Sequence, residues 1–68
     1  MRIPDDVMEH TLRVTTTDGE EYVGSGWRYD QYYSFDAYGR EEETLDMLSD
    51  KGAVVLFEND IISIEYLE

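Results

Sequence analysis

Hydrophobic and polar positions alternate with a period of two early in the chain. Leu12, Val14 and Thr16 alternate with polar residues over positions 11–17, and β-branched residues at this spacing are typical of a strand. Residues 4–9 precede it, beginning with proline and carrying three acidic residues. Proline and carboxylates suit the N-terminus of a helix, so we expect one short helical turn there.

Glycines mark the next features of the pattern. Asp18-Gly19 is the clearest hairpin signal, because glycine supplies the positive φ of a tight turn. Residues 20–29 form the returning strand, and Gly24 and Gly26 within it indicate a bulge or a sharp bend. A small barrel needs strands that bend in this way.

The second half of the chain predicts three more strands. Residues 32–38 are rich in aromatics, and residues 53–57 are continuously apolar and therefore expected to be buried. Residues 61–67 follow a tight turn at positions 58–60. Residues 41–48 allow two interpretations, a short helix with two leucines on one face or an extended acidic loop.

Five short strands in 68 residues predict one domain, 1–68, of the mainly β class. A strongly bent five-stranded sheet that closes into a small barrel removes exposed strand edges. A domain of this size buries only about 60% of its unfolded surface, so its stability is expected to be marginal. The expected core residues are Leu12, Val14, Tyr22, Phe35, Val54, Leu56, Ile61, Ile62 and Ile64.

The charge of the chain is strongly negative. It carries 17 acidic and 5 basic residues, for a formal net charge of -12. Nucleic-acid binding depends on Lys and Arg contacts to phosphate, so nucleic acid is an unlikely ligand. A basic protein surface would be attracted instead. Simple solubility, or adaptation to a salty cytoplasm, accounts for the same acidity.

Aromatic residues are frequent for so acidic a chain, which predicts a folded domain instead of a disordered tail. Exposed Tyr and Trp side chains are common interface anchors, and ordinary barrel filling is the alternative for those that turn inward. The residues that we expect to bind a partner are Trp27, Tyr29, Tyr32, Tyr33, Asp36 and Tyr38, with the acidic residues Glu41, Glu42 and Glu43.

Catalytic and metal-binding chemistry have little support. His10 is the one histidine, no nucleophile motif accompanies it, and a structural role is expected. The acidic residues at 41–46 lack the spacing and the glycine of an EF-hand, and a solvated acidic face is expected there. A barrel this small leaves little room for a pocket of roughly 300 Å³. We therefore expect no enzyme activity, no cofactor and no metal.

The location of the protein is constrained by what its sequence lacks. No apolar run approaches the roughly 20 residues of a membrane span. The first residues lack the apolar stretch of a secretory signal, and the absence of cysteine fits a reducing compartment. We expect a soluble cytoplasmic protein that does not contact membranes.

The order of these parts resembles the Sm and Sm-like proteins. In the first motif of that family a glycine follows the turn glycine by five positions, and an aspartate follows six positions later. Gly19, Gly24 and Asp30 have this spacing. Residues 54–56 and 61–65 resemble the second motif. The resemblance covers most of the chain and implies an SH3-like five-stranded barrel.

Departures from the Sm pattern fall at its RNA-binding positions. Sm proteins bind single-stranded RNA in rings, and an asparagine four residues after the motif aspartate contacts the base. Ser34 stands at that spacing from Asp30, and Phe57-Glu58 aligns with an Arg-Gly pair. Gly26 also replaces a usual apolar residue. A shorter and an acidic side chain disfavour RNA at this site.

Two hypotheses from different classes follow. The first is a non-enzymatic module that binds a basic protein, with nucleic-acid mimicry by a phage or mobile-element inhibitor as its sharpest form. The second is an Sm-like oligomeric RNA-binding protein, in which Asp30 and Ser34 would contact RNA. Edge strands of neighbouring copies would pair in such an oligomer. For Asp30, capping of a turn is the structural alternative.

Overall fold

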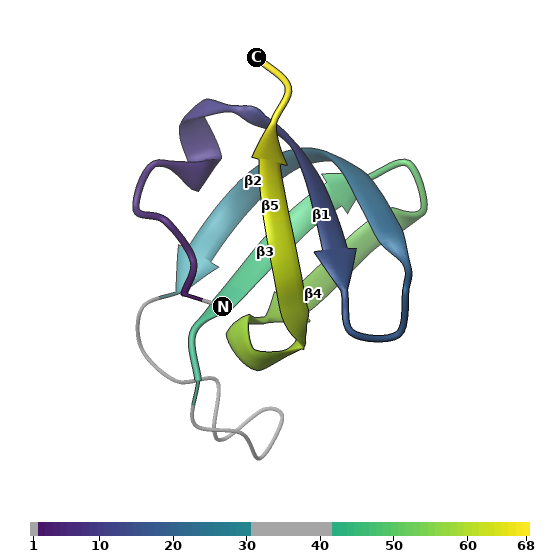
Figure 1. The fold of residues 1–68 in the computed structure, drawn as a ribbon. Helices are drawn as coiled ribbons and strands as arrows, with labels where there is room; N and C mark the ends of the chain where they lie inside the picture. Colours follow the sequence, from purple (N-terminus) through teal and green to yellow (C-terminus); the bar gives the residue numbers. More distant parts are fainter. Residues whose placement is uncertain (1, 31–41) are drawn as a thin grey trace.

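A computed structural model describes residues 2–30 and 42–68, with the backbone alone at 28–30. Five antiparallel strands form one sheet in the order β4-β3-β2-β1-β5 (Figure 1). Two short 3-10 turns, η1 and η2, accompany the strands. The elements are η1 Val7–Glu9, β1 Thr11–Thr16, β2 Glu21–Asp30, β3 Thr44–Ser49, β4 Gly52–Phe57, η2 Glu58–Asp60 and β5 Ile61–Tyr66. The mainly β class is confirmed.

The alternating pattern of β1 corresponds to alternating burial of its side chains, as expected for a strand. Leu12, Val14 and Thr16 are buried, and the residues between them are partly exposed. The hairpin that follows β1 turns at Gly19, whose φ is 85°, and Gly19 N donates to Thr16 O at 2.9 Å. A positive φ of this size is accessible to glycine at little steric cost. Local chemistry is therefore sufficient to form this hairpin.

The glycines of β2 mark a close approach of strands and a bulge. A Cβ on Gly24 would lie 2.0 Å from the backbone oxygen of Leu48 on β3, so no larger residue fits there without backbone movement. Gly26 pairs with Met47, and Arg28 pairs with Asp46, which leaves Trp27 as an extra residue between two paired positions. The bulge expected near the glycines is present, and it bends the long strand.

β3 replaces the helix or loop considered for residues 41–48. Thr44–Ser49 pairs with β2 on one side and with β4 on the other. Leu45 and Met47 are fully buried at a period of two, whereas Leu48 is exposed. Both interpretations are therefore wrong for residues 44–48, because pairing on both sides outweighs the local helical preference of the acidic and leucine residues there. The strand predicted at 32–38 lies outside the described residues.

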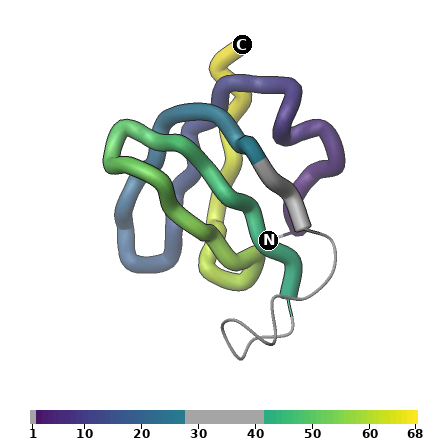
Figure 2. The backbone as a smooth tube through the Cα atoms, turned by 180° about the vertical axis from the view of Figure 1, so that it is seen from behind, coloured from purple at the N-terminus to yellow at the C-terminus, as the bar shows by residue number. Residues whose placement is uncertain are grey.

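The core lies on the concave side of the curved sheet. Figures 1 and 2 show β1 and β5 crossing over β3 and β4, with the interior between them. Ile3 and Val7 are buried members of this core that the sequence pattern did not indicate. Its members are Ile3, Val7, Leu12, Val14, Leu45, Met47, Leu56 and Ile61, with Tyr22, Val54 and Ile64 packed against them.

Ile62 was expected in the core but is 59% exposed. Thr15 pairs with Ser63 and Thr16 with Ile61, so Ile62 is the extra residue of a second bulge. A bulge redirects the side chain of its extra residue, which turns Ile62 away from the interior. Phe35, also expected in the core, lies outside the described residues.

The two ends of the sheet remain strand edges in the described part of the chain. Among the described strands, β4 pairs only with β3, and β5 pairs only with β1, so each has one side without a neighbouring strand of the sheet. The short turn η2 connects the two edge strands, and Thr17 N donates to Asp60 O at 2.8 Å across to the β1–β2 turn. Within residues 2–30 and 42–68, no helix has the length and apolar character needed to span a membrane.

Candidate functional site

The residues predicted to bind a partner divide into four groups, one of which, Glu42 and Glu43, lies just before β3. Trp27 is on the surface, with 52% of its area exposed. Tyr29 is described by its backbone, which pairs with Leu45 in the sheet. The others, Tyr32, Tyr33, Asp36, Tyr38 and Glu41, lie outside the described residues, as does Ser34 of the RNA-binding alternative.

Trp27 is exposed because it is the extra residue of the β2 bulge. Three elements with exposed apolar side chains meet at its neighbour Gly26. Leu48 follows Met47, the partner of Gly26 on β3. Met8 of η1 has its Cγ 3.6 Å from the place where a Cβ of Gly26 would lie. Met8, Trp27 and Leu48 are thus exposed apolar residues on three neighbouring elements, and we call this set of residues, which does not form a single contact patch, the Trp27 region.

The acidic residues at 42 and 43 have a structural role. Glu42 is only 5% exposed, and its Oε1 accepts a hydrogen bond from Asn59 N at 3.0 Å. Glu58 N donates to Glu43 O at 3.0 Å, and Glu43 N donates to Glu58 Oε1 at 3.4 Å. These bonds attach the chain just before β3 to η2. The expected solvated acidic face is therefore wrong at Glu42.

Two basic side chains, Arg13 of β1 and Lys51 in the β3–β4 turn, are engaged by carboxylates of the same chain. Arg13 on β1 lies between Glu65 of β5, with Nη1 and Oε1 at 2.9 Å, and Glu21 of β2, with Nε and Oε1 at 3.6 Å. Both pairs are partly exposed, so each contributes little to stability. Their importance is electrostatic, because they neutralise Arg13 as a potential partner for phosphate.

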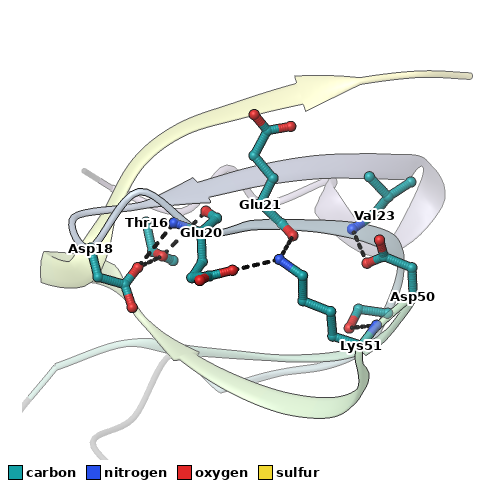
Figure 3. A network of polar contacts seen from close by, with 8 residues as sticks. Thr16, Asp18, Glu20, Glu21, Val23, Asp50 and Lys51 are labelled. Atoms are coloured by element: carbon teal, nitrogen blue, oxygen red, sulfur yellow. Dashed lines mark hydrogen bonds and ion pairs between the residues drawn. The ribbon is translucent and has the colours of Figure 1, made fainter.

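Lys51 is held in the same way, as Figure 3 shows. Its Nζ lies 2.7 Å from Glu20 Oε2 and 2.7 Å from the backbone oxygen of Glu21. It also lies 5.0 Å from the centre of the Tyr22 ring, within the range of a cation–π contact. The hydrogen bond to Glu20 raises the pKa of Lys51. This surface therefore already stabilises an ammonium group.

A cavity of about 280 Å³ lies beside the β1–β2 turn. Its walls come from that turn, from Tyr22 of β2, from the end of β4 and from η2. The expectation that the fold has little room for a pocket needs correction, although the volume is close to the lower limit of about 300 Å³ for small-molecule sites. The main lining residues are Asp18, Tyr22, Val55, Leu56, Phe57 and Asp60, with two threonines before Asp18.

Asp18 supplies a persistent negative charge to this cavity. Its Oδ1 accepts hydrogen bonds from the Thr16 hydroxyl and from Glu20 N, the latter at 3.2 Å (Figure 3). The bond from Thr16, followed by that from Glu20, lowers the pKa of Asp18, because both bonds favour the ionised carboxylate. The sequence marked Asp18 only as a turn residue, since local patterns do not show which distant strand lies opposite.

His10 connects the two ends of the fold. Its ring stacks on Tyr66 with centroids 4.1 Å apart and an interplanar angle of 9°. Nδ1 lies 2.6 Å from the backbone oxygen of Glu68, and Nε2 lies 3.5 Å from Asp6 Oδ2. The Tyr66 hydroxyl donates to Asp6 Oδ1. These contacts give His10 a role in holding η1 to β5.

Residues 2–30 and 42–68 contain no cluster of three or more His, Asp or Glu side chains that could hold an ion. No family model, no curated protein and no solved structure matches the chain. The function of the protein must therefore be inferred from the geometry and charge of the chain itself.

Proposed function

We propose that this protein is a non-enzymatic module that binds a basic protein in the cytoplasm. The observation that carries the proposal is the coexistence of exposed apolar side chains in the Trp27 region with a net charge of -12. Carboxylates speed the encounter with a cationic surface and favour it over other surfaces. Tryptophan contributes large contact area once the surfaces meet.

The distribution of cations supports a protein partner over a nucleic acid. Arg13 and Lys51 are both paired with glutamates. A phosphate chain that used either of these two cations would have to break its pair and approach the surrounding carboxylates, which costs affinity. In its sharpest form the proposal is nucleic-acid mimicry, in which the acidic surface occupies the phosphate-binding groove of a partner and inhibits it.

A fluorescence anisotropy titration with a labelled lysine-rich peptide tests this proposal. We expect saturable binding that weakens between about 50 and 200 mM NaCl, because salt screens exposed charges. Trp27→Ala should weaken binding about tenfold, in the range of an interface anchor. Leu67→Ala is the matched control, since Leu67 is an exposed apolar residue at the far end of β5. Equal binding by the Trp27 variant and the wild type would contradict the proposal.

The second candidate function is an Sm-like oligomer that binds RNA. The observation in its favour is that β4 and β5 both end the sheet in the described part of the chain, so copies could pair edge to edge. Light scattering with and without poly-U RNA distinguishes it. A ring-sized particle that binds RNA tightly at physiological salt would favour this candidate over the protein-binding module.

A further inference from the structure

The register of β4 with β3 determines which of its residues direct their backbone N–H and C=O groups toward the free edge of the sheet. Glu58 N donates to Glu43 O at 3.0 Å, which makes 58 and 43 a hydrogen-bonded pair in the antiparallel register. Such pairs recur at every second residue, so Val54 and Leu56 direct their backbone groups to β3. Ala53 and Val55 therefore direct their N–H and C=O groups away from β3, toward the edge of the sheet.

The sequence of β4 itself, Gly52–Phe57 within the described residues, lacks the charged residues and proline that usually protect an edge strand. Ala53 is exposed, and Val55 is partly exposed. An extended chain could therefore pair with β4 through backbone hydrogen bonds.

The 280 Å³ cavity lies at the same edge, because Val55 is one of its lining residues. Side chains of an added strand alternate between its two faces, so one of them can enter the cavity. Its lining includes the Asp18 carboxylate and the Tyr22 ring, and it contains no cationic residue. The contact of Lys51 with Tyr22 shows that this ring accepts a cation.

We propose that β4 binds an extended segment of a basic partner protein as an added strand, and that the cavity takes a Lys or Arg side chain from it. This inference rests on the proposed function and specifies the form of its partner. A second copy of the chain is the less suitable occupant, because two molecules of net charge -12 repel each other.

The test uses the whole protein and a short capped peptide of alternating Thr and Val with a central Arg. Hydrogen exchange measured by NMR should show new protection of the Ala53 and Val55 amides on binding. The Val54 and Leu56 amides, which already face β3, are internal controls and should change little. Protection confined to other parts of the molecule would overturn the inference.

Two altered peptides separate the strand contact from the charge contact without changing the protein. A peptide with N-methyl groups on the paired backbone positions should lose binding, because it cannot form the ladder. Replacing Arg by citrulline, a neutral side chain of similar shape, should weaken binding about tenfold, as expected for the loss of a charge-assisted hydrogen bond. If either peptide binds as well as the parent, the inference is wrong.

A pair of variants tests the cavity from the other side. Asp18→Asn keeps an acceptor for Thr16 and Glu20 but removes the charge, and it should weaken the Arg peptide about tenfold. Glu9→Gln removes the same charge from exposed η1 and should not. If the lysine-rich peptide binds at Trp27 but the β4 amides are not protected, this inference alone is rejected. If neither binding at Trp27 nor protection of β4 is seen, the proposed function is rejected as well. Concentration-dependent dimerisation that buries β4 would assign the edge to a second copy.

Discussion

The hydroxyl of Tyr66 donates to the carboxylate of Asp6, which joins the first turn of the chain to its last strand. This hydrogen bond raises the pKa of Tyr66 to about 12 and lowers the pKa of Asp6 below its ordinary 3.8. Both shifts have the same cause, because the bond needs a protonated phenol and favours an ionised carboxylate. A single exposed contact thus makes stability depend on pH at both extremes.

Removing this hydroxyl should reveal the pH dependence directly. The Tyr66 pKa is higher in the folded state, so its contribution is complete below about pH 10 and is lost as pH rises through about 12. The Asp6 pKa is lower in the folded state, so its contribution is present above 3.8 and is lost as pH falls through the folded value. Tyr66→Phe should therefore lower the urea midpoint between these limits, and the difference from wild type should shrink outside them.

The control for this experiment is Tyr22→Phe, which changes a tyrosine of β2 that packs against the core, whereas the hydrogen bond to Asp6 comes from Tyr66. It should not show a difference confined to that pH range. A Tyr66→Phe difference that stays constant from pH 3 to beyond pH 12 would show that the hydrogen bond to Asp6 does not contribute.

At the scale of the element, two bulges determine which apolar side chains reach solvent. Trp27 in β2 and Ile62 in β5 are both extra residues between paired positions. Both residues are more than half exposed to solvent, Trp27 at 52% and Ile62 at 59%. Each bulge also increases the local twist of its strand. The same irregularities thus curve the sheet around its core and place apolar groups on its surface.

Adjacent isoleucines in β5 provide a matched test of the second bulge. Ile61 is 1% exposed and Ile62 is 59% exposed. Ile61→Ala should lower the free energy of unfolding by about 2–5 kcal/mol, because it leaves a cavity in the core. Ile62→Ala should change it by only about 0.5 kcal/mol, as for a surface site. Urea unfolding of both variants checks this, and equal losses would place Ile62 inside.

At the scale of the whole molecule, negative charge opposes compaction. A net charge of -12 is carried by a fold whose Cα radius of gyration is 10.9 Å. Like charges at these separations destabilise the folded state through self-repulsion. The ion pairs of Arg13 and Lys51 offset only a small part of this repulsion. The same acidity that we propose attracts a basic partner therefore also weakens the isolated domain.

Screening this repulsion should stabilise the protein. Raising NaCl from about 10 mM to 150 mM shortens the Debye length from roughly 30 Å to 8 Å, so the urea midpoint should rise. Tetramethylammonium chloride at equal ionic strength should give a similar rise, because screening does not depend on the cation. A fall in the midpoint with both salts would show that the ion pairs outweigh the general repulsion.

The sequence alone determined the features that depend on neighbouring residues. The period of two at Leu12 and Val14 predicted β1, and Asp18-Gly19 predicted the hairpin, because side-chain alternation and a positive φ are local properties. The total charge is likewise a property of composition. These features limited the fold to a small β domain, and the total charge supports the proposal of a basic partner.

Only the tertiary structure decided the features that depend on pairing between strands distant in the sequence. Leu45 and Met47 belong to a strand because β2 and β4 lie on both sides of them. Ile62 points outward because its register with β1 shifts by one residue. The cavity beside Asp18 exists because the curved sheet brings the end of β4 to the β1–β2 turn. A short sequence pattern indicates the conformational preference of a segment but not the strand with which it pairs. That pairing determines which of its side chains are buried and which residues line the cavity.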